Sequence, residues 1–308
     1  MELGAHLPLI SFGGESWSLH RLVNYARTAR DLGYTSLTAN DHFVFPKPWL
    51  DGPTALAAVI QHSGDMSLMT TVSIPVVRGL MGTAKTLGAI DLLSGGRLIV
   101  GVGPGSSAKD YEAVGVDFEE RWKRLDDVVP ALRALWSGQD YEGRFYSTEG
   151  IRLEPLPDRR HGPPIWIGSW GSSAGLRRTA RLADGWLASA YNTTPTEFAD
   201  ARTRLAGHLD ANGKDPEAFP NGLASMFMYV TEDEGEADRI IRDVIRRAID
   251  RPEEELRERL LLGNAESCAA KLAAYQEAGL QRVFVWPVED ELDQLAILRE
   301  QVAPQIGA

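Results

Sequence analysis

The sequence predicts a closed barrel of eight parallel β-strands, each followed by an α-helix, in one domain that spans residues 1–308. Short apolar runs alternate along the chain with longer stretches of helical periodicity, and eight such runs are present. Because strict alternation of strands and helices requires helical crossovers, the strands should form a parallel sheet. Eight units close such a sheet into a (β/α)8 TIM barrel, here with small insertions.

The strands are expected where short apolar runs lie between turn residues. In chain order they are Glu2–Pro8, Ser36–Ala39, Leu68–Ile74, Leu98–Val102, Ile165–Gly168, Gly185–Ala188, Leu223–Val230 and Arg282–Trp286.

The first helix shows how the helical segments are recognised. Ser18 can cap it, apolar residues recur on one face through Leu32, and Gly33 ends it. By the same pattern the remaining helices are expected at Thr54–His62, Thr83–Leu93, Glu119–Leu135, Ser173–Leu182, Pro195–Asn212, Ser267–Ala278 and Glu289–Val302. A charged stretch, Glu234–Leu261, also has helical spacing, and a small hairpin is expected from Tyr141–Phe145 and Ile151–Leu153.

Composition and charge exclude several classes of protein. The formal net charge of −11 supplies no basic surplus for nucleic acid or for an anionic membrane surface. The one cysteine, Cys268, cannot form an intrachain disulfide, and its helical surroundings predict a buried thiol. No signal peptide and no transmembrane run are visible, so we expect a cytoplasmic protein.

In such barrels the functional residues lie at the carboxyl ends of the strands. Here these positions are rich in glycine, serine and aromatic residues, and Asp41 is the only acid directly at a strand end. A single carboxylate disfavours a glycosidase, and the scattered histidines disfavour a metal site. The sequence from Gly168 to Gly171 does not match a serine-nucleophile elbow. A hydride-transfer cofactor, bound by backbone amides and stacked aromatic rings, fits these positions better.

His42 is the only histidine at a strand end, and it can exchange a proton near neutral pH. Asp41 could orient it or could face the barrel. The alternative is that His42 only holds its loop in place.

Two further segments could contact a bound cofactor. Ser169-Trp-Gly-Ser-Ser173 opens a helix, where free amides and hydroxyls make an anion site or, more commonly, a plain helix cap. Gly101-Val-Gly-Pro-Gly105 lacks the third glycine of a dinucleotide fingerprint, so that interpretation is rejected. Its glycines, Gly103 among them, would still let the backbone approach a ring or a ribityl chain.

Taken together, several short motifs resemble one family, the luciferase-like flavin monooxygenases and their F420-dependent relatives. The markers run over most of the chain: Asn40-Asp-His-Phe43, Thr70-Thr-Val72, Pro75, Arg78, Leu92-Leu-Ser-Gly-Gly-Arg97, Gly101-Val-Gly-Pro-Gly105, Gly115, Arg121, Leu135-Trp136, Pro163-Pro-Ile-Trp-Ile-Gly168 and Ala183-Asp-Gly-Trp186. Each is loose alone, but their order and spacing are specific for the family.

The resemblance implies a site built around a flavin-type ring. His42 is similar to the active-site histidine beside the reactive ring position, and Asp41 to a neighbour that touches the cofactor. Thr71-Val72 falls where the family carries a non-prolyl cis peptide behind the ring. Ser169, Trp170, Gly171 and Ser172 match the segment that holds the cofactor phosphate. The Asp-His pair and the short loops favour F420, with FMN as the alternative.

The same resemblance implies an F420-dependent oxidoreductase acting on a small organic substrate, in a homodimer. Trp49 is placed like an aromatic residue that walls the substrate pocket in some deazaflavin members; Phe12 and Trp286 could join it, although each could equally be core. Ser106 stands where some of these enzymes carry a proton-donating glutamate. The alternatives are an FMN-dependent two-component monooxygenase supplied by a separate reductase, and a cofactor-binding barrel with little turnover.

Overall fold

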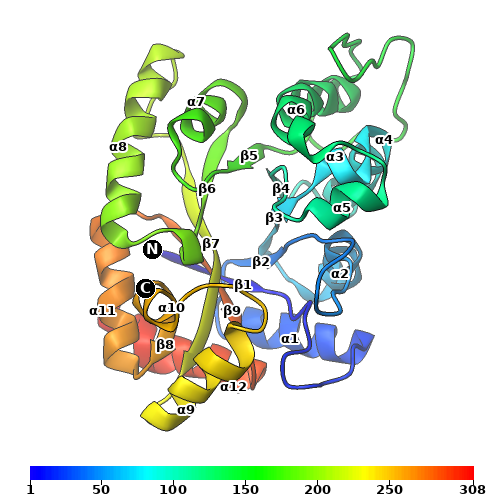
Figure 1. Cartoon of the computed structure of the whole chain (residues 1–308). Helices are drawn as coiled ribbons and strands as arrows, with labels where there is room; N and C mark the ends of the chain where they lie inside the picture. The colour runs from blue at the N-terminus through cyan, green and yellow to red at the C-terminus, as the bar shows by residue number, and fades with distance from the viewer.

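The computed structural model describes all residues, 1–308, and forms a closed barrel of eight parallel strands inside a ring of helices (Figure 1). Strand β1 pairs in parallel with β2 on one side and with β9 on the other, and β7 pairs with both β6 and β9. The ring order is therefore β1-β2-β3-β4-β5-β6-β7-β9, which confirms the predicted barrel. The barrel strands are β1 (Glu2–His6), β2 (Ser36–Ala39), β3 (Ser67–Ser73), β4 (Leu98–Val102), β5 (Ile165–Gly168), β6 (Gly185–Ser189), β7 (Asn221–Val230) and β9 (Arg282–Pro287).

The helices that follow the strands confirm the predicted segments with shifted ends. Ser18 caps the first helix by accepting a hydrogen bond from the Arg21 N–H, as expected. The second helix begins earlier than predicted because the Asp51 carboxylate accepts from the Thr54 N–H at 2.9 Å. The helices are α1 (Leu19–Asp31), α2 (Gly52–Val59), α3 (Pro75–Arg78), α4 (Leu80–Leu93), α5 (Ala108–Ala113), α6 (Arg121–Ser137), α7 (Ser173–Leu182), α8 (Pro195–Ala211), α11 (Ala265–Glu277) and α12 (Glu291–Ile297).

The charged stretch after β7 is not one continuous helix, which corrects the sequence-based expectation. It contains α9 (Glu234–Arg239), a π-helical turn over Ile240–Ile245, and α10 (Glu253–Arg259). It ends in an additional short strand, β8 (Leu261–Gly263), which pairs in parallel with the last residues of β7. Because β7 has ten residues, it extends beyond β6 and leaves an edge that β8 covers.

The segment between α6 and β5 is an irregular excursion beside α4 (Figure 1), not the predicted two-stranded hairpin. Only one antiparallel bridge forms there, between Glu142 and Ser147. The Asp127 carboxylate on α6 accepts the backbone N–H groups of Phe145 and Tyr146. These two N–H groups therefore donate to a side chain of α6 and do not pair with a second strand.

The inside of the barrel is filled by two large rings, Trp166 of β5 and Phe284 of β9, which lie in one buried cluster. Glycines on neighbouring strands leave the space for them. A Cβ atom at Gly185 would lie 2.4 Å from the Trp166 ring, and one at Gly222 would lie 2.9 Å from the Phe284 ring. The barrel is thus a packed core and not a channel.

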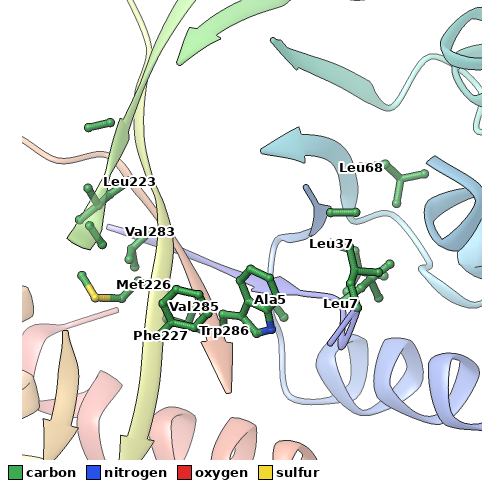
Figure 2. Close-up of a cluster of buried hydrophobic side chains, with 14 of the residues drawn as sticks. Ala5, Leu7, Leu37, Leu68, Leu223, Met226, Phe227, Val283, Val285 and Trp286 are labelled. Atoms are coloured by element: carbon green, nitrogen blue, oxygen red, sulfur yellow. The ribbon is translucent and has the colours of Figure 1, made fainter. Parts of the chain in front are cut away.

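A second and larger core lies between the strands and the surrounding helices. Figure 2 shows part of it, with Ala5, Leu37 and Leu68 of β1, β2 and β3 and with Val283 and Val285 of β9, the strand beside β1. The alternation of these residues with inward-pointing ones along each strand follows the two-residue period of a β-strand.

His6 ends β1 as a buried, uncharged group. Its Nδ1 lies 2.8 Å from the Leu7 carbonyl oxygen, its Nε2 accepts from the Asn40 N–H at 3.1 Å, and its ring stacks on Trp286 with centroids 3.7 Å apart. Burial is the main cause that lowers the pKa of His6 to about 3. The neutral His6 ring therefore has a packing role at the carboxyl end of β1.

Two other sequence expectations concern Cys268 and the membrane. Cys268 is buried on α11 as expected, and burial raises the pKa of its thiol to about 11. No helix combines the length and the apolar character that crossing a bilayer requires.

Replacing Gly185 by alanine should destabilise the barrel, because the added methyl group meets the Trp166 ring and the interior has no free space. We expect a loss of about 1–3 kcal/mol in the free energy of unfolding, measured by urea denaturation. Gly207→Ala is the matched control, because no atom lies within 4 Å of its added Cβ on α8. Equal effects of the two substitutions would contradict the proposed packing.

The protein should lose stability as the pH falls below 6.5, where His6 binds a proton in the unfolded chain but not in the folded one. The expected slope from this group is about 1.4 kcal/mol per pH unit. Urea midpoints between pH 6.5 and 5 should fall less steeply in His6→Gln than in the parent. His161→Gln, at an exposed position, should leave the slope unchanged; a His6 variant with the parent slope would refute a neutral buried ring.

Candidate functional site

A cavity of about 380 Å³ opens at the carboxyl ends of the strands, from β2 round to β7. The part of its wall that the sequence predicted comprises Asp41, His42, Thr71, Val72, Gly103, Ser169, Trp170 and Ser172. Residues in or directly after four different strands, β2 to β5, thus meet at one end of the barrel, as the fold requires. Gly171 lies in the same loop but outside the wall.

The floor of the cavity is built around Val72, which follows a cis peptide bond from Thr71, as the resemblance implies. A Cβ atom at Gly103 would lie 2.8 Å from the Val72 side chain, and one at Gly168 would lie 2.9 Å from it. These glycines therefore make room for Val72 itself, a reason for them that the sequence did not reveal. The Thr71 hydroxyl is buried in the same wall and has no hydrogen-bond partner.

His42 is held by Asp110 of α5, a residue that the sequence analysis missed. His42 Nδ1 lies 2.8 Å from Asp110 Oδ2, and the other carboxylate oxygen accepts from the N–H groups of Phe43 and Val44 at 2.9 and 2.6 Å. Burial alone would raise the pKa of Asp110, but these hydrogen bonds outweigh it and hold that pKa below its ordinary value. The carboxylate therefore accepts the proton of Nδ1 and leaves Nε2 as the free nitrogen.

Asp41 does not orient His42, because its carboxylate is used by Arg78. Arg78 Nη2 lies 2.6 Å from Asp41 Oδ1, and Arg78 Nε also donates to this carboxylate. The same guanidinium contacts Asp51, the residue that caps α2. Burial disfavours the charged guanidinium, but its bonds to the two carboxylates outweigh this and raise the pKa of Arg78. Of the two roles considered for Asp41, orienting His42 is therefore wrong.

The three aromatic residues expected to wall a substrate pocket lie beside the cavity and not in its wall. Trp49 packs edge-on against His42 with centroids 4.7 Å apart, and Trp286 lies behind Trp49 at 5.6 Å. Phe12 is one step further away, 6.3 Å from Trp286. Trp286 is only 1% exposed and belongs to the core. Only Trp49 thus touches a residue of the wall, and its contact with a substrate stays a prediction.

The loop after β5 contributes hydroxyl groups to the cavity. Ser172 caps α7 by accepting from the Gly175 N–H at 3.2 Å, so the commoner of the two interpretations, a helix cap, holds. Ser172 is also a wall residue, and its hydroxyl hydrogen remains available to a ligand. Ser169 is buried next to it. Capping and anion binding are therefore compatible at this helix.

Several wall residues were not among the predicted site residues, although Arg121 was a marker of the family resemblance. Arg121 and Trp122 begin α6, Tyr191 follows β6, and Ser225 lies inside β7 with a φ of 57° where the register with β9 shifts. Tyr191 stands two residues after β6, among the residues that the strand ends point to, but it was not predicted as a site residue. Asp110, Arg121, Trp122 and Ser225 do not follow a strand end, so reading the strand ends alone could not have found them. No group of three or more His, Cys, Asp or Glu side chains is arranged to hold a metal ion.

Two relatives by sequence are F420-dependent enzymes. The F420-dependent glucose-6-phosphate dehydrogenase of Mycolicibacterium gilvum is 26% identical over 95% of both chains. The F420-dependent hydroxymycolic acid dehydrogenase of Mycobacterium tuberculosis is 27% identical over 72% of this chain. That match spans only 62% of the relative.

A solved structure, an F420-dependent secondary alcohol dehydrogenase in complex with an F420-acetone adduct, superposes with a TM-score of 0.86. It is 17% identical and is covered over 98% of its chain and 99% of this one, which shows the shared fold. Residues 10–250 match the family model described as luciferase-like monooxygenase. The chain belongs to the luciferase-like monooxygenase family.

Proposed function

We propose that this chain is an F420-dependent oxidoreductase that transfers a hydride between the deazaflavin ring and a small organic substrate. His42 is the group that exchanges the proton. The observation that carries the proposal is the His42–Asp110 pair in the wall of the cavity, with Nδ1 engaged and Nε2 free. The F420-dependent relatives support the choice of cofactor.

The cavity suits a cofactor with a flat ring and a polar tail. Val72 would support the ring, and the unpartnered Thr71 hydroxyl offers a hydrogen bond that the protein leaves unused. Ser169 and Ser172 would hold the phosphate at the start of α7. When bound, F420 supplies a ring carbon that accepts or gives a hydride.

Asp110 gives His42 a defined proton-transfer role. With Nδ1–H donated to the carboxylate, the neutral ring presents a lone pair at Nε2 and can take up a proton there. The nearby negative charge stabilises the imidazolium that results, and the hydrogen bond fixes the orientation of the ring. His42 can therefore act as acid or base, depending on the direction of the reaction.

Ser106 narrows the class of reaction. It lies in the wall at the position where some relatives carry a glutamate, and its hydroxyl is not an acid at neutral pH. Asp41, the one carboxylate of the wall, is bound by Arg78. His42 is thus left as the proton-exchanging group, which favours reactions in which one proton accompanies each hydride. The reduction of an activated carbon–carbon, carbon–nitrogen or carbon–oxygen double bond is such a reaction.

The second candidate is an FMN-dependent two-component monooxygenase, supplied with reduced flavin by a separate reductase. The acidic surface, with a net charge of −11, favours it, because the oligoglutamate tail of F420 gains little attraction from such a protein. A cofactor-binding barrel with little turnover is the third candidate, suggested by Ser106.

The homodimer also stays a proposal. Met81, Leu92 and Leu93 are exposed on α4, which is apolar on most of its faces. A helix of this kind is usually covered, so we propose that a second copy packs against it.

Titration of the purified protein, followed by fluorescence, tests the cofactor. We expect F420 to bind at micromolar or lower concentration, and FMN at least about tenfold more weakly, which corresponds to about 1.4 kcal/mol. The reverse order, together with oxygen consumption on adding reduced FMN, would favour the monooxygenase. Failure to bind either cofactor would refute the proposed function.

Asp110→Asn should separate the role of the carboxylate from that of the histidine. The amide cannot stabilise the imidazolium, so we expect kcat/KM to fall about 10- to 100-fold. His42→Ala should cost about 10²- to 10⁴-fold. Glu112→Gln, an exposed change on the same helix, is the control and should leave kcat/KM unchanged.

A further inference from the structure

Resting on the proposed function, we propose that Ser225 is a ligand-binding residue, and that a bulge in β7 turns its hydroxyl into the cavity to hydrogen-bond an uncharged polar group of the bound ligand. Such a group, a carbonyl oxygen or an N–H, can belong to the polar edge of the cofactor ring or to the substrate, and binding and kinetic measurements separate the two. The inference comes from a strained backbone position inside a long buried strand.

The bulge lies where β7 pairs with β9. From Leu223 to Met226 the chain of β7 advances three residues, while their partners on β9 are only two residues apart. Leu223 and Met226 both belong to the core between the strands and the helices (Figure 2). A regular strand would place one inward-facing residue between them, but here there are two, Ala224 and Ser225, and both line the cavity. Bulges of this kind re-aim a side chain and are common beside active sites.

The backbone of Ser225 has a conformation that serine disfavours. Its φ is 57°, in the left-handed region, and it is the only residue other than glycine that has such an angle inside a strand of this protein. A Cβ atom makes this region costly, and glycine is the usual residue at such a position in a bulge. Glycine would relieve the strain and keep the bulge. The presence of serine is therefore better explained by what its side chain does in the cavity.

The side of the cavity formed by β6 and β7 carries hydroxyl groups but no charge. Its wall residues are Leu187, Ala188, Ser189, Tyr191, Ala224 and Ser225. The Ser189 hydroxyl already accepts from the Asn192 side chain at 3.0 Å, whereas no protein group bonds to the Ser225 hydroxyl. Ser225 is also the only residue of β7 that is not buried. With no cation among these residues, this side of the cavity suits an uncharged hydrogen-bonding group better than an anion.

The apolar floor of the cavity leads from Val72 towards Ser225. Val72 packs against the cluster that contains Leu187 and Ala224, and all three line the cavity. A flat ring supported by Val72 would therefore extend over Leu187 and Ala224 and bring its edge to Ser225. A serine hydroxyl both donates and accepts, so it can bond a carbonyl or the N–H of a flavin-type pyrimidine ring, or an oxygen of a substrate placed beside the ring.

Stability in the absence of ligand tests the strain. We expect Ser225→Gly to have a higher urea midpoint than Ser225→Ala, because glycine adopts a positive φ freely. Ser67, a partly buried residue that begins β3 without a positive φ, is the matched control. There the order should reverse, with Ser67→Gly below Ser67→Ala, because glycine weakens an ordinary strand. A Ser225→Gly midpoint below that of Ser225→Ala would show an unstrained bulge and would overturn the inference.

Ligand binding tests the hydroxyl. Dissociation constants for F420 and for its phosphate-free analogue, the corresponding deazariboflavin, are measured by fluorescence. If Ser225 bonds the ring, Ser225→Ala and Ser225→Gly should bind both ligands about 3- to 10-fold more weakly. If it bonds the substrate, both constants should stay within about twofold of the parent values, and KM for cyclohexenone with reduced F420 should rise about 3- to 10-fold. Ser67→Ala should change none of these values.

Unchanged dissociation constants in Ser225→Ala, without a rise in KM for cyclohexenone, would overturn the inference, since the hydroxyl would then serve no ligand. Weaker binding of F420 with unaffected binding of the analogue would also overturn it, because the contact would then lie at the tail of the cofactor. If the parent bound neither ligand, the proposed function itself would fail. If the parent preferred FMN, FMN and riboflavin would form the test pair, since both carry the same pyrimidine ring.

Discussion

The packing of large side chains against glycines is the constraint on which this structure depends. Trp166 and Phe284 fill the barrel because Gly185 and Gly222 stand where any other residue would collide with them. The same relation recurs one layer higher, where Gly103 leaves space for Val72. Filling the interior in this way gives the cavity a solid floor, so a ring placed on it is held from one side by protein. The same kind of contact, a large side chain against a glycine, therefore packs the core and shapes the cavity.

Charge around the cavity follows a second rule, that buried charges occur in pairs. Arg78 satisfies Asp41, and Asp110 satisfies two backbone N–H groups and His42. The wall of the cavity leaves several polar groups without a protein partner, among them one histidine nitrogen, the Thr71 hydroxyl and the amide oxygen of Asn40. Because leaving such groups unsatisfied costs free energy, their concentration in one cavity is better explained by a ligand than by chance.

The sequence predicted the barrel because each strand and helix has its own local pattern, and eight alternating units have one simple way to close. It also predicted His42 and Ser172, which line the cavity, since both lie within a few residues of a strand end. It could not find Asp110, whose position depends on how α5 turns back over the barrel. The short strand β8 was missed because its pairing depends on the length of β7, and the predicted hairpin failed because Asp127 takes its donors. Local periodicity carries no information about such tertiary hydrogen bonds.

The Asp110 carboxylate joins two segments that are far apart in the chain, since it binds the loop after β2 from a helix that follows β4. The two loops are mechanically coupled, and an insertion in either one would displace the imidazole. Evolutionary variation in loop length is therefore restricted at this quadrant of the barrel. Diversification of substrate range in descendants of this chain should instead accumulate in the segments after β6 and β7, where Tyr191 and Ser225 border the cavity without contacting the proton-transfer pair.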